Sequence, residues 1–167
     1  MTAPVHGIDV ENNAGFTVDA ERLRHAARTV LAQQGIDPSA GVTIVMADDD
    51  TVRSLNLSFR RVNSVTDVLS FPAESLPEEI RAELGEPLYL GDLIIAYPYA
   101  EAQAVSLGHR VDENLALLVV HGVLHLLGYD HDTPDHRAEM WAAQETALVA
   151  LGISPALVPG LEDVPHD

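Results

Sequence analysis

The feature that most constrains this chain is a helix without a polar face. Residues 111–127 predict an α-helix that is apolar almost all the way round. A helix of that kind is buried on every side, so the remaining elements must pack around it. We therefore expect residues 111–127 at the centre of the fold.

The rest of the chain predicts strands and helices around that segment. Hydrophobic patterns and turn residues delimit the elements. We expect strands at 5–11, 42–46, 65–71 and 89–97, helices from Thr17 or Asp19 to 34 and at 51–59, 99–107 and 134–151, and a surface loop or short helix at 73–86. Such a mixture predicts one α+β or α/β domain. The domain would comprise residues 1–151, followed by a flexible, Pro-rich tail at 152–167.

The charge of the chain argues against several classes of protein. Its 26 Asp and Glu residues outweigh 9 basic residues, all of them Arg, and give a net charge of −17. Binding to nucleic acid or anionic lipid through bulk electrostatics is therefore not expected. We see no signal peptide and no apolar run of the roughly 18 residues that a membrane span needs. We expect a soluble cytoplasmic protein without disulfides or thiolate metal sites, because the chain has no Cys.

Three histidines are spaced for a metal ion. His121 and His125 are four residues apart, so they share one face of the predicted helix. Gly128 allows the chain to turn, and His131 can then return to the same point. Three imidazole ligands leave a coordination position open, as a catalytic site requires. The alternative is a cluster of hydrogen-bonded core histidines, but their sequence neighbours are apolar and offer no polar partners.

The same spacing occurs in the metzincin proteases, with one difference that matters. Those enzymes place a Glu general base directly after the first His, where this chain has Gly122. Met140 and Trp141 lie inside a predicted helix rather than in a Met-turn. A zinc metallopeptidase is therefore disfavoured. His136, five residues after His131, is expected to be a solvated side chain.

Two further blocks, taken with the histidine segment, resemble a known family. Residues 66–72 are Thr-Asp-Val-Leu-Ser-Phe-Pro, residues 90–93 are Leu-Gly-Asp-Leu, and residues 121–131 are His-Gly-Val-Leu-His-Leu-Leu-Gly-Tyr-Asp-His. In this order they resemble the signatures of the YbeY family of bacterial rRNA maturation factors. The resemblance extends over effectively the whole predicted domain. It departs from the family at Leu93, where the family has Ile, and at Val65, where many relatives have Pro.

The resemblance implies a fold, an activity and a set of partners. The fold would be a single zincin-like α+β domain, with a small mixed sheet and a central metal-bearing helix. The activity would be that of a zinc-dependent, single-strand-specific endoribonuclease in 16S rRNA 3′-end maturation, ribosome assembly and ribosome quality control. The partners would be single-stranded rRNA, the small ribosomal subunit, small-subunit ribosomal proteins and an assembly GTPase, with no membrane involved.

The functional residues of the family fall on four positions of this chain. Its zinc ligands correspond to His121, His125 and His131, and its functional arginine corresponds to Arg60. An ion held by three histidines polarises a phosphoryl oxygen and lowers the pKa of bound water. The guanidinium of Arg60 matches phosphate oxygens, although a surface salt bridge is its ordinary role. His121 and Arg60 are thus the catalytic candidates.

Other assignments remain open. Asp130 could orient a ligand imidazole or take a proton, whereas Asp67 and Asp92 fit turn or capping roles at least as well as catalysis. Glu145 is expected on a solvated helix face. The residues fix neither the metal, among Zn, Ni, Co and Fe, nor whether water or a 2′-hydroxyl attacks. A non-catalytic, zinc-stabilised ribosome-assembly factor is the main alternative.

An RNA substrate has to be reconciled with the net charge of −17. The attraction must be local, at the bound cation and at Arg53, Arg60 and Arg61. This predicts weak binding to free RNA and better recruitment on a ribosomal particle.

Overall fold

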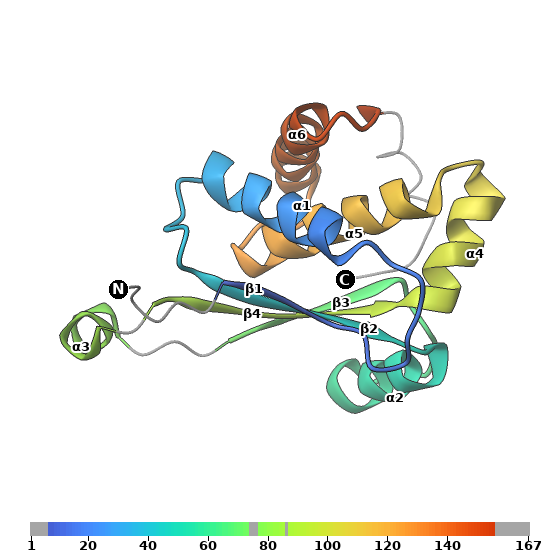
Figure 1. Cartoon of the computed structure of the whole chain (residues 1–167), viewed down its shortest axis with the longest axis horizontal. Coiled ribbons are helices and arrows are strands. Elements are labelled where there is room, and N and C mark those ends of the chain that lie inside the picture. Colours follow the sequence, from blue (N-terminus) through green and yellow to red (C-terminus); the bar gives the residue numbers. More distant parts are fainter. Residues whose placement is uncertain (1–6, 74–76, 86, 156–167) are drawn as a thin grey trace.

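One mixed β-sheet organises the part of the chain that the computed structural model describes, which comprises residues 7–73, 77–85 and 87–155. Within these residues the sheet has four strands in the order β1-β2-β4-β3 (Figure 1). The strands are β1 (Ile8–Glu11), β2 (Gly41–Ala47), β3 (Val68–Pro72) and β4 (Tyr89–Ala96). Strands β1, β2 and β4 run parallel, and β3 pairs antiparallel with β4. This order makes β3 an edge strand.

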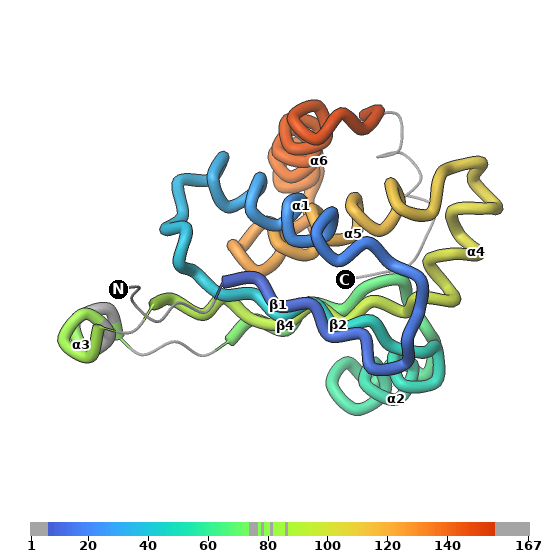
Figure 2. The backbone as a smooth tube through the Cα atoms, in the orientation of Figure 1, coloured from blue at the N-terminus to red at the C-terminus, as the bar shows by residue number. Residues whose placement is uncertain are grey.

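Helices cover both faces of the sheet. The helices of the described residues are α1 (Ala20–Gln33), α2 (Asp49–Arg60), α3 (Glu78–Leu84), α4 (Tyr97–Leu107), α5 (Val111–Leu126) and α6 (Pro134–Ala150). Figure 1 shows α1, α5 and α6 on one side of the sheet and α2 on the other. Helices α4 and α3 lie at opposite ends of the strands (Figure 2). The larger hydrophobic core fills the space between the sheet and the helices α1, α5 and α6.

Helix α5 is the central helix of the fold, as its apolar sequence predicts. Every residue from 114 to 124 is buried. Helices α1, α4 and α6 and strands β3 and β4 all contact it, which accounts for burial around its whole circumference. Any polar side chain on this helix must therefore find its partners within the protein.

The α+β class and the small mixed sheet are confirmed, while several boundaries differ from the prediction. Asp19, not Thr17, caps α1, since its side chain accepts a hydrogen bond from the N–H of Arg22. Pro72 does not stop β3 but is its last residue, which an edge strand tolerates. Pro98 lies in the first turn of α4 rather than between strand and helix, because a helix does not need its N–H there.

Part of the sequence prediction lies outside the described residues. Helix α3 occupies the middle of segment 73–86, where the sequence predicts a surface loop or short helix. Residues 74–76, 86 and 156–167 are not described, so the flexible tail and the domain boundary at 151 stay predictions. Among the described residues, no helix is long and apolar enough to cross a membrane.

Candidate metal centre

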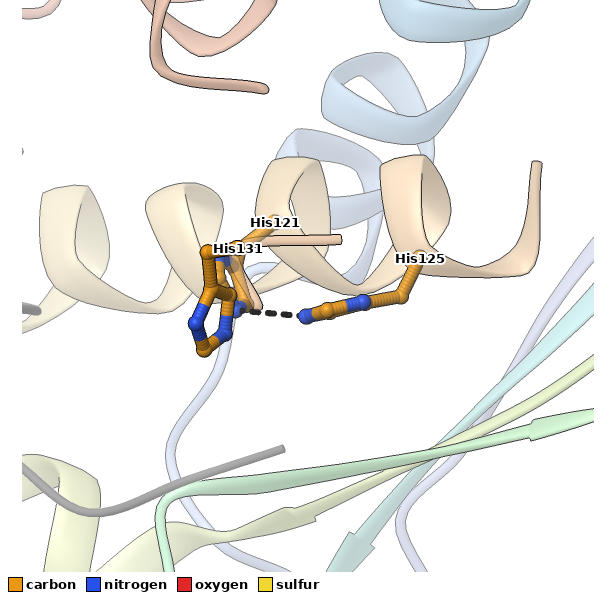
Figure 3. A group of neighbouring side chains, drawn as sticks. All are labelled: His121, His125 and His131. Carbon is orange, nitrogen blue, oxygen red and sulfur yellow. Dashed lines mark hydrogen bonds between the residues drawn. The ribbon is translucent and has the colours of Figure 1, made fainter. Parts of the chain in front are cut away.

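Two of the three candidate ligands project from one face of α5. His121 is 1% exposed, and His125, one turn later, is half-buried. Their Nε2 atoms face each other at 3.1 Å, and their ring centroids are 4.6 Å apart. Figure 3 shows the two rings meeting below the helix. The spacing of four residues thus brings two imidazole nitrogens together, as the sequence predicts.

The third histidine returns to this point through the turn that follows α5. Gly128 in this turn adopts a positive φ of 101°. The carboxylate of Asp130 then accepts a hydrogen bond of 2.7 Å from the backbone N–H of His131. The ring centroid of His131 lies 5.6 Å from that of His121 and 5.3 Å from that of His125. One nitrogen from each of the three histidines lies within 4.8 Å of the others.

Hydrogen bonds at the Nδ1 atoms of His121 and His125 leave their Nε2 atoms suited to bind a cation. The Nδ1 of His121 lies 2.5 Å from the side-chain oxygen of Gln144, and the Nδ1 of His125 lies 2.9 Å from the carbonyl oxygen of Tyr129. Both oxygens accept hydrogen bonds, so each Nδ1 carries the proton and each Nε2 keeps its lone pair. Two lone pairs 3.1 Å apart repel each other unless a cation lies between them. The three histidines therefore suit a divalent metal ion.

Gln144 is the residue of this site that the motif does not reveal. It lies on α6 and is fully buried, and its Nε2 has no hydrogen-bond partner among the described residues. The other buried side chains of α6 are Met140, Ala147 and Leu148. A single polar residue in an otherwise apolar stripe is the sequence signal that points to it. Trp141, also on α6, packs against two of the three histidine rings.

Replacing Gln144 is expected to change the affinity of the site for metal. Gln144→Leu removes the acceptor that fixes the tautomer of His121, and losses of this kind cost about 10- to 100-fold in metal affinity. Gln144→Glu keeps an acceptor of the same shape and should hold or raise the affinity. Zinc dissociation constants from competition with a chelator would compare the two variants. Equal affinities of Gln144→Leu and the wild type would contradict this role.

Gly122 faces the sheet rather than open space. An added Cβ would meet the side chain of Leu93 on β4 at 2.7–3.3 Å. The Oγ of Ser70 on β3 lies 3.5 Å from the carbonyl oxygen of Gly122. The missing Glu after the first histidine thus has a packing reason, because a larger side chain would push α5 away from the strands. This position cannot serve as the general base of a metallopeptidase.

Arg60 lies on the other face of the sheet from α5. It is the last residue of α2, and Figure 1 shows the sheet between the two helices. Its Nη1 donates a hydrogen bond of 3.1 Å to the Oδ1 of Asn56, a buried residue whose Nδ2 donates to the carbonyl oxygen of Ser64. The hydrogen bond to Asn56 holds the guanidinium at the end of α2. Its catalytic role stays a prediction.

Two of the acidic candidates have structural partners. Asp67 is fully buried, and its carboxylate accepts hydrogen bonds from the N–H of Val68 and from the side chain of Gln103. Asp92 accepts a hydrogen bond from the hydroxyl of Tyr89. Burial and this hydrogen bond raise the pKa of Tyr89 to about 12. The carboxylate of Asp67 thus connects the start of β3 to α4, and that of Asp92 binds a side chain of its own strand, β4.

The remaining polar candidates face solvent or the loop backbone. The carboxylate of Asp130 accepts a hydrogen bond from the backbone N–H of His131 and so helps to order this loop, while its role toward a ligand imidazole or a proton stays a prediction. Glu145 is exposed on α6, as the sequence predicts. His136 is also exposed, and its hydrogen bond to Asp132 raises the pKa of the imidazole.

Comparison with known proteins identifies the family. A family model described as Endoribonuclease YbeY matches residues 8–152, a span that includes the three histidines and every strand and helix of the described residues. The chain belongs to the YbeY family. The Endoribonuclease YbeY of Mycolicibacterium smegmatis is 39% identical over 143 residues, which are 84% of this chain and 80% of that protein. The one of Mycobacterium sp. strain KMS is also 39% identical, over 84% of this chain and 81% of its own length.

A solved structure shares the fold of this YbeY-family chain. The solution structure of a protein from Thermotoga maritima superposes with a TM-score of 0.53 at 21% identity. The match covers 86% of this chain and 90% of that protein. At this identity the likeness concerns the fold, and it agrees with the mixed sheet and central helix described above.

Proposed function

We propose that this YbeY-family chain is a zinc-dependent, single-strand-specific endoribonuclease. We place its work in 16S rRNA 3′-end maturation, ribosome assembly and ribosome quality control, and hence in the cytoplasm. One observation carries the proposal: three histidine nitrogens converge within 4.8 Å of one another in a chain of a family described as endoribonucleases.

The residues divide the work between metal and substrate. His121, His125 and His131 would hold the ion, and Gln144 would maintain the tautomer of His121. When bound, a zinc ion supplies Lewis acidity toward a phosphoryl oxygen and acidifies water. Arg60 would bind phosphate oxygens of the RNA with its planar, permanently charged guanidinium.

The net charge of the chain determines how an RNA substrate would be recruited. At −17, the chain repels free RNA at long range, so contacts at the metal centre and the few exposed Arg must supply the attraction. The acidic surface would instead favour basic partners, which suits recruitment by small-subunit ribosomal proteins and an assembly GTPase. The rRNA would then be presented on a small-subunit particle rather than captured from solution.

A non-catalytic role for the metal has one specific observation in its favour. His121 is 1% exposed at the centre of the fold. An ion held there would join α5 to the loop that carries His131 and would contribute to the free energy of folding. The chain would then be a zinc-stabilised ribosome-assembly factor that cuts no RNA.

Cleavage of single-stranded rRNA by the purified, metal-loaded protein separates these two functions. The proposed nuclease cuts the RNA, and a chelator that removes the metal stops the reaction. The substrate should be offered both free and within small-subunit particles. A folded, metal-loaded protein that cuts neither form would contradict the proposal and support the assembly factor.

Arg60→Ala is expected to lower the cleavage rate by about 10- to 150-fold at unchanged metal content. A hydrogen bond to a charged group contributes about 1.5–3 kcal/mol, which corresponds to that range. Arg28→Ala is the matched control, because Arg28 is also an exposed helical Arg but lies on α1 and pairs with Glu21. Wild-type rates in both variants would show that Arg60 does not contact the substrate.

A further inference from the structure

The exposed end of α2 combines an aromatic ring with two cations. Phe59 is 68% exposed, and Arg60 and Arg61 directly follow it and are exposed as well. Residues 54–66 contain these two Arg and no Asp or Glu, although the whole chain carries a net charge of −17. These three residues, Phe59, Arg60 and Arg61, form the α2 end patch, which is both apolar and positive.

The ring of Phe59 is held in place on one side and open on the other. It packs edge-to-face against Phe71 of β3, with ring centroids 5.2 Å apart and an interplanar angle of 67°. The neighbouring Arg60 is held by its hydrogen bond to Asn56. A fixed aromatic ring beside cations is the arrangement on which single-stranded nucleic acids stack their bases.

Arg61 occupies a backbone position that favours glycine. It ends α2 in the left-handed region, with φ 61° and ψ 27°. Gly108 ends α4 with nearly the same angles, φ 74° and ψ 27°. Within the described part of the chain, Arg61 is the only non-glycine residue with a positive φ. A side chain at this position costs free energy relative to glycine, and the side chain of Arg61 is exposed there.

The α2 end patch and the metal centre lie on the two sides of one edge strand. Successive side chains of a strand point to opposite faces. Ser70 of β3 faces α5, where its Oγ lies 3.5 Å from the carbonyl oxygen of Gly122, the residue after the first histidine. The next residue, Phe71, faces α2 and supports Phe59. A flexible strand that crosses the free edge of β3 can therefore reach both sites.

The cleft next to the loop that carries His131 is acidic and therefore unsuited to RNA. A cleft of about 480 Å³ lies beside the loop that follows α5. Its lining includes Asp130, Asp132 and Glu139, which would repel phosphate groups. The charge distribution thus favours entry across β3, from the side of the α2 end patch.

We infer that the α2 end patch binds the single-stranded RNA substrate. A nucleobase stacks on Phe59, Arg61 binds a backbone phosphate, and the strand crosses β3 to the metal centre. This inference rests on the proposed function, because it takes the substrate to be RNA.

Binding of a fluorescein-labelled 2′-O-methyl oligoadenylate of about 12 nucleotides tests the inference, since that length suits such sites. Fluorescence anisotropy would give dissociation constants for the zinc-loaded protein, with the oligomer checked on a gel for intactness. Phe59→Ala should weaken binding about 5- to 150-fold, and Phe59→Trp should restore it. Val105→Ala is the control, because Val105 is 71% exposed on α4.

Arg61→Gly gives an independent test, because it separates a role of Arg61 in RNA binding from a role in the fold alone. Glycine relieves the backbone strain, so this variant should be at least as stable as the wild type. Its RNA affinity should nevertheless fall, and the salt dependence of log K should weaken by about 0.7, the value for one lost phosphate contact on a single strand. Arg28→Ala removes the same charge from α1 and should leave both quantities unchanged.

The outcomes distinguish this inference from the proposed function. If the wild type cleaves rRNA but Phe59→Ala and Arg61→Gly bind the oligomer as their controls do, the inference is wrong and the nuclease stands. If the wild type neither binds nor cuts RNA, both fail together. Loss of binding in the two patch variants alone, at unchanged zinc content, supports the inference.

Discussion

Replacing His131 by alanine is expected to remove the bound metal and to lower RNA cleavage by at least about 10³-fold while the protein stays folded. This loss corresponds to about 4 kcal/mol of transition-state stabilisation. In the proposed site three imidazoles would hold the ion, and two of them alone would bind it weakly and position it poorly. Zinc content after dialysis and the cleavage rate on single-stranded rRNA would measure the effect.

His131 is the best of the three ligands for this experiment because its removal disturbs the core least. It lies in the loop after α5 and is half-buried, whereas His121 is 1% exposed within the central helix. His121→Ala would therefore leave a cavity as well as an incomplete site, and large-to-small core changes of this kind cost about 2–5 kcal/mol of stability. A loss of activity in that variant alone would not separate catalysis from folding.

His136→Ala is the matched control for His131→Ala. His136 lies five residues further on, is exposed, and forms a hydrogen bond with Asp132 rather than joining the three ligands. Its removal should leave zinc content and cleavage close to those of the wild type. If His131→Ala were folded and metal-free yet still cut RNA at the wild-type rate, the activity would not belong to this metal centre.

The part of this site that local rules govern can be predicted from the sequence. The apolar residues around His121 and His125 predict a buried central helix. The spacing of four residues between these two histidines places both of them on one face of that helix. The return of His131 follows from the helix end at Gly128, which takes a positive φ as expected. These relations span a few residues of chain, so the folded structure reproduces them.

The part that depends on contacts between distant elements cannot be predicted in this way. Gln144 meets His121 only because α6 packs on α5. The packing reason for Gly122 appears only once β4 brings Leu93 against it. The position of Arg60 on the far face of the sheet likewise depends on how α2 packs against the sheet, which no local pattern encodes.

Gly91→Ala is expected to destabilise the protein by about 2–6 kcal/mol. Gly91 lies on β4 with a φ of 142°, a conformation that costs other residues about 1–3 kcal/mol. An added Cβ would also overlap the carbonyl oxygen of Phe71 on β3 and meet the side chain of Leu126 on α5 at 3.0 Å. Overpacking of this kind costs about 1–3 kcal/mol more, because the backbone of β3 cannot move aside as a flexible side chain would.

Thermal unfolding of the zinc-loaded protein would measure this loss, which should lower Tm by about 5–20 °C for a chain of this size. Gly35→Ala is the matched control, since Gly35 also has a positive φ, of 68°, but an added Cβ meets nothing within 4 Å. The difference between the two variants reports the close approach of β3, β4 and α5 together with the rarer backbone conformation of Gly91.

Leu126 directly follows His125, so the folded fraction of Gly91→Ala should also bind zinc more weakly. If Gly91→Ala and Gly35→Ala lowered Tm equally and Gly91→Ala bound zinc like the wild type, the prediction would be wrong. Gly91 would then be required only for its backbone conformation, and not for the packing of α5 against β3 and β4.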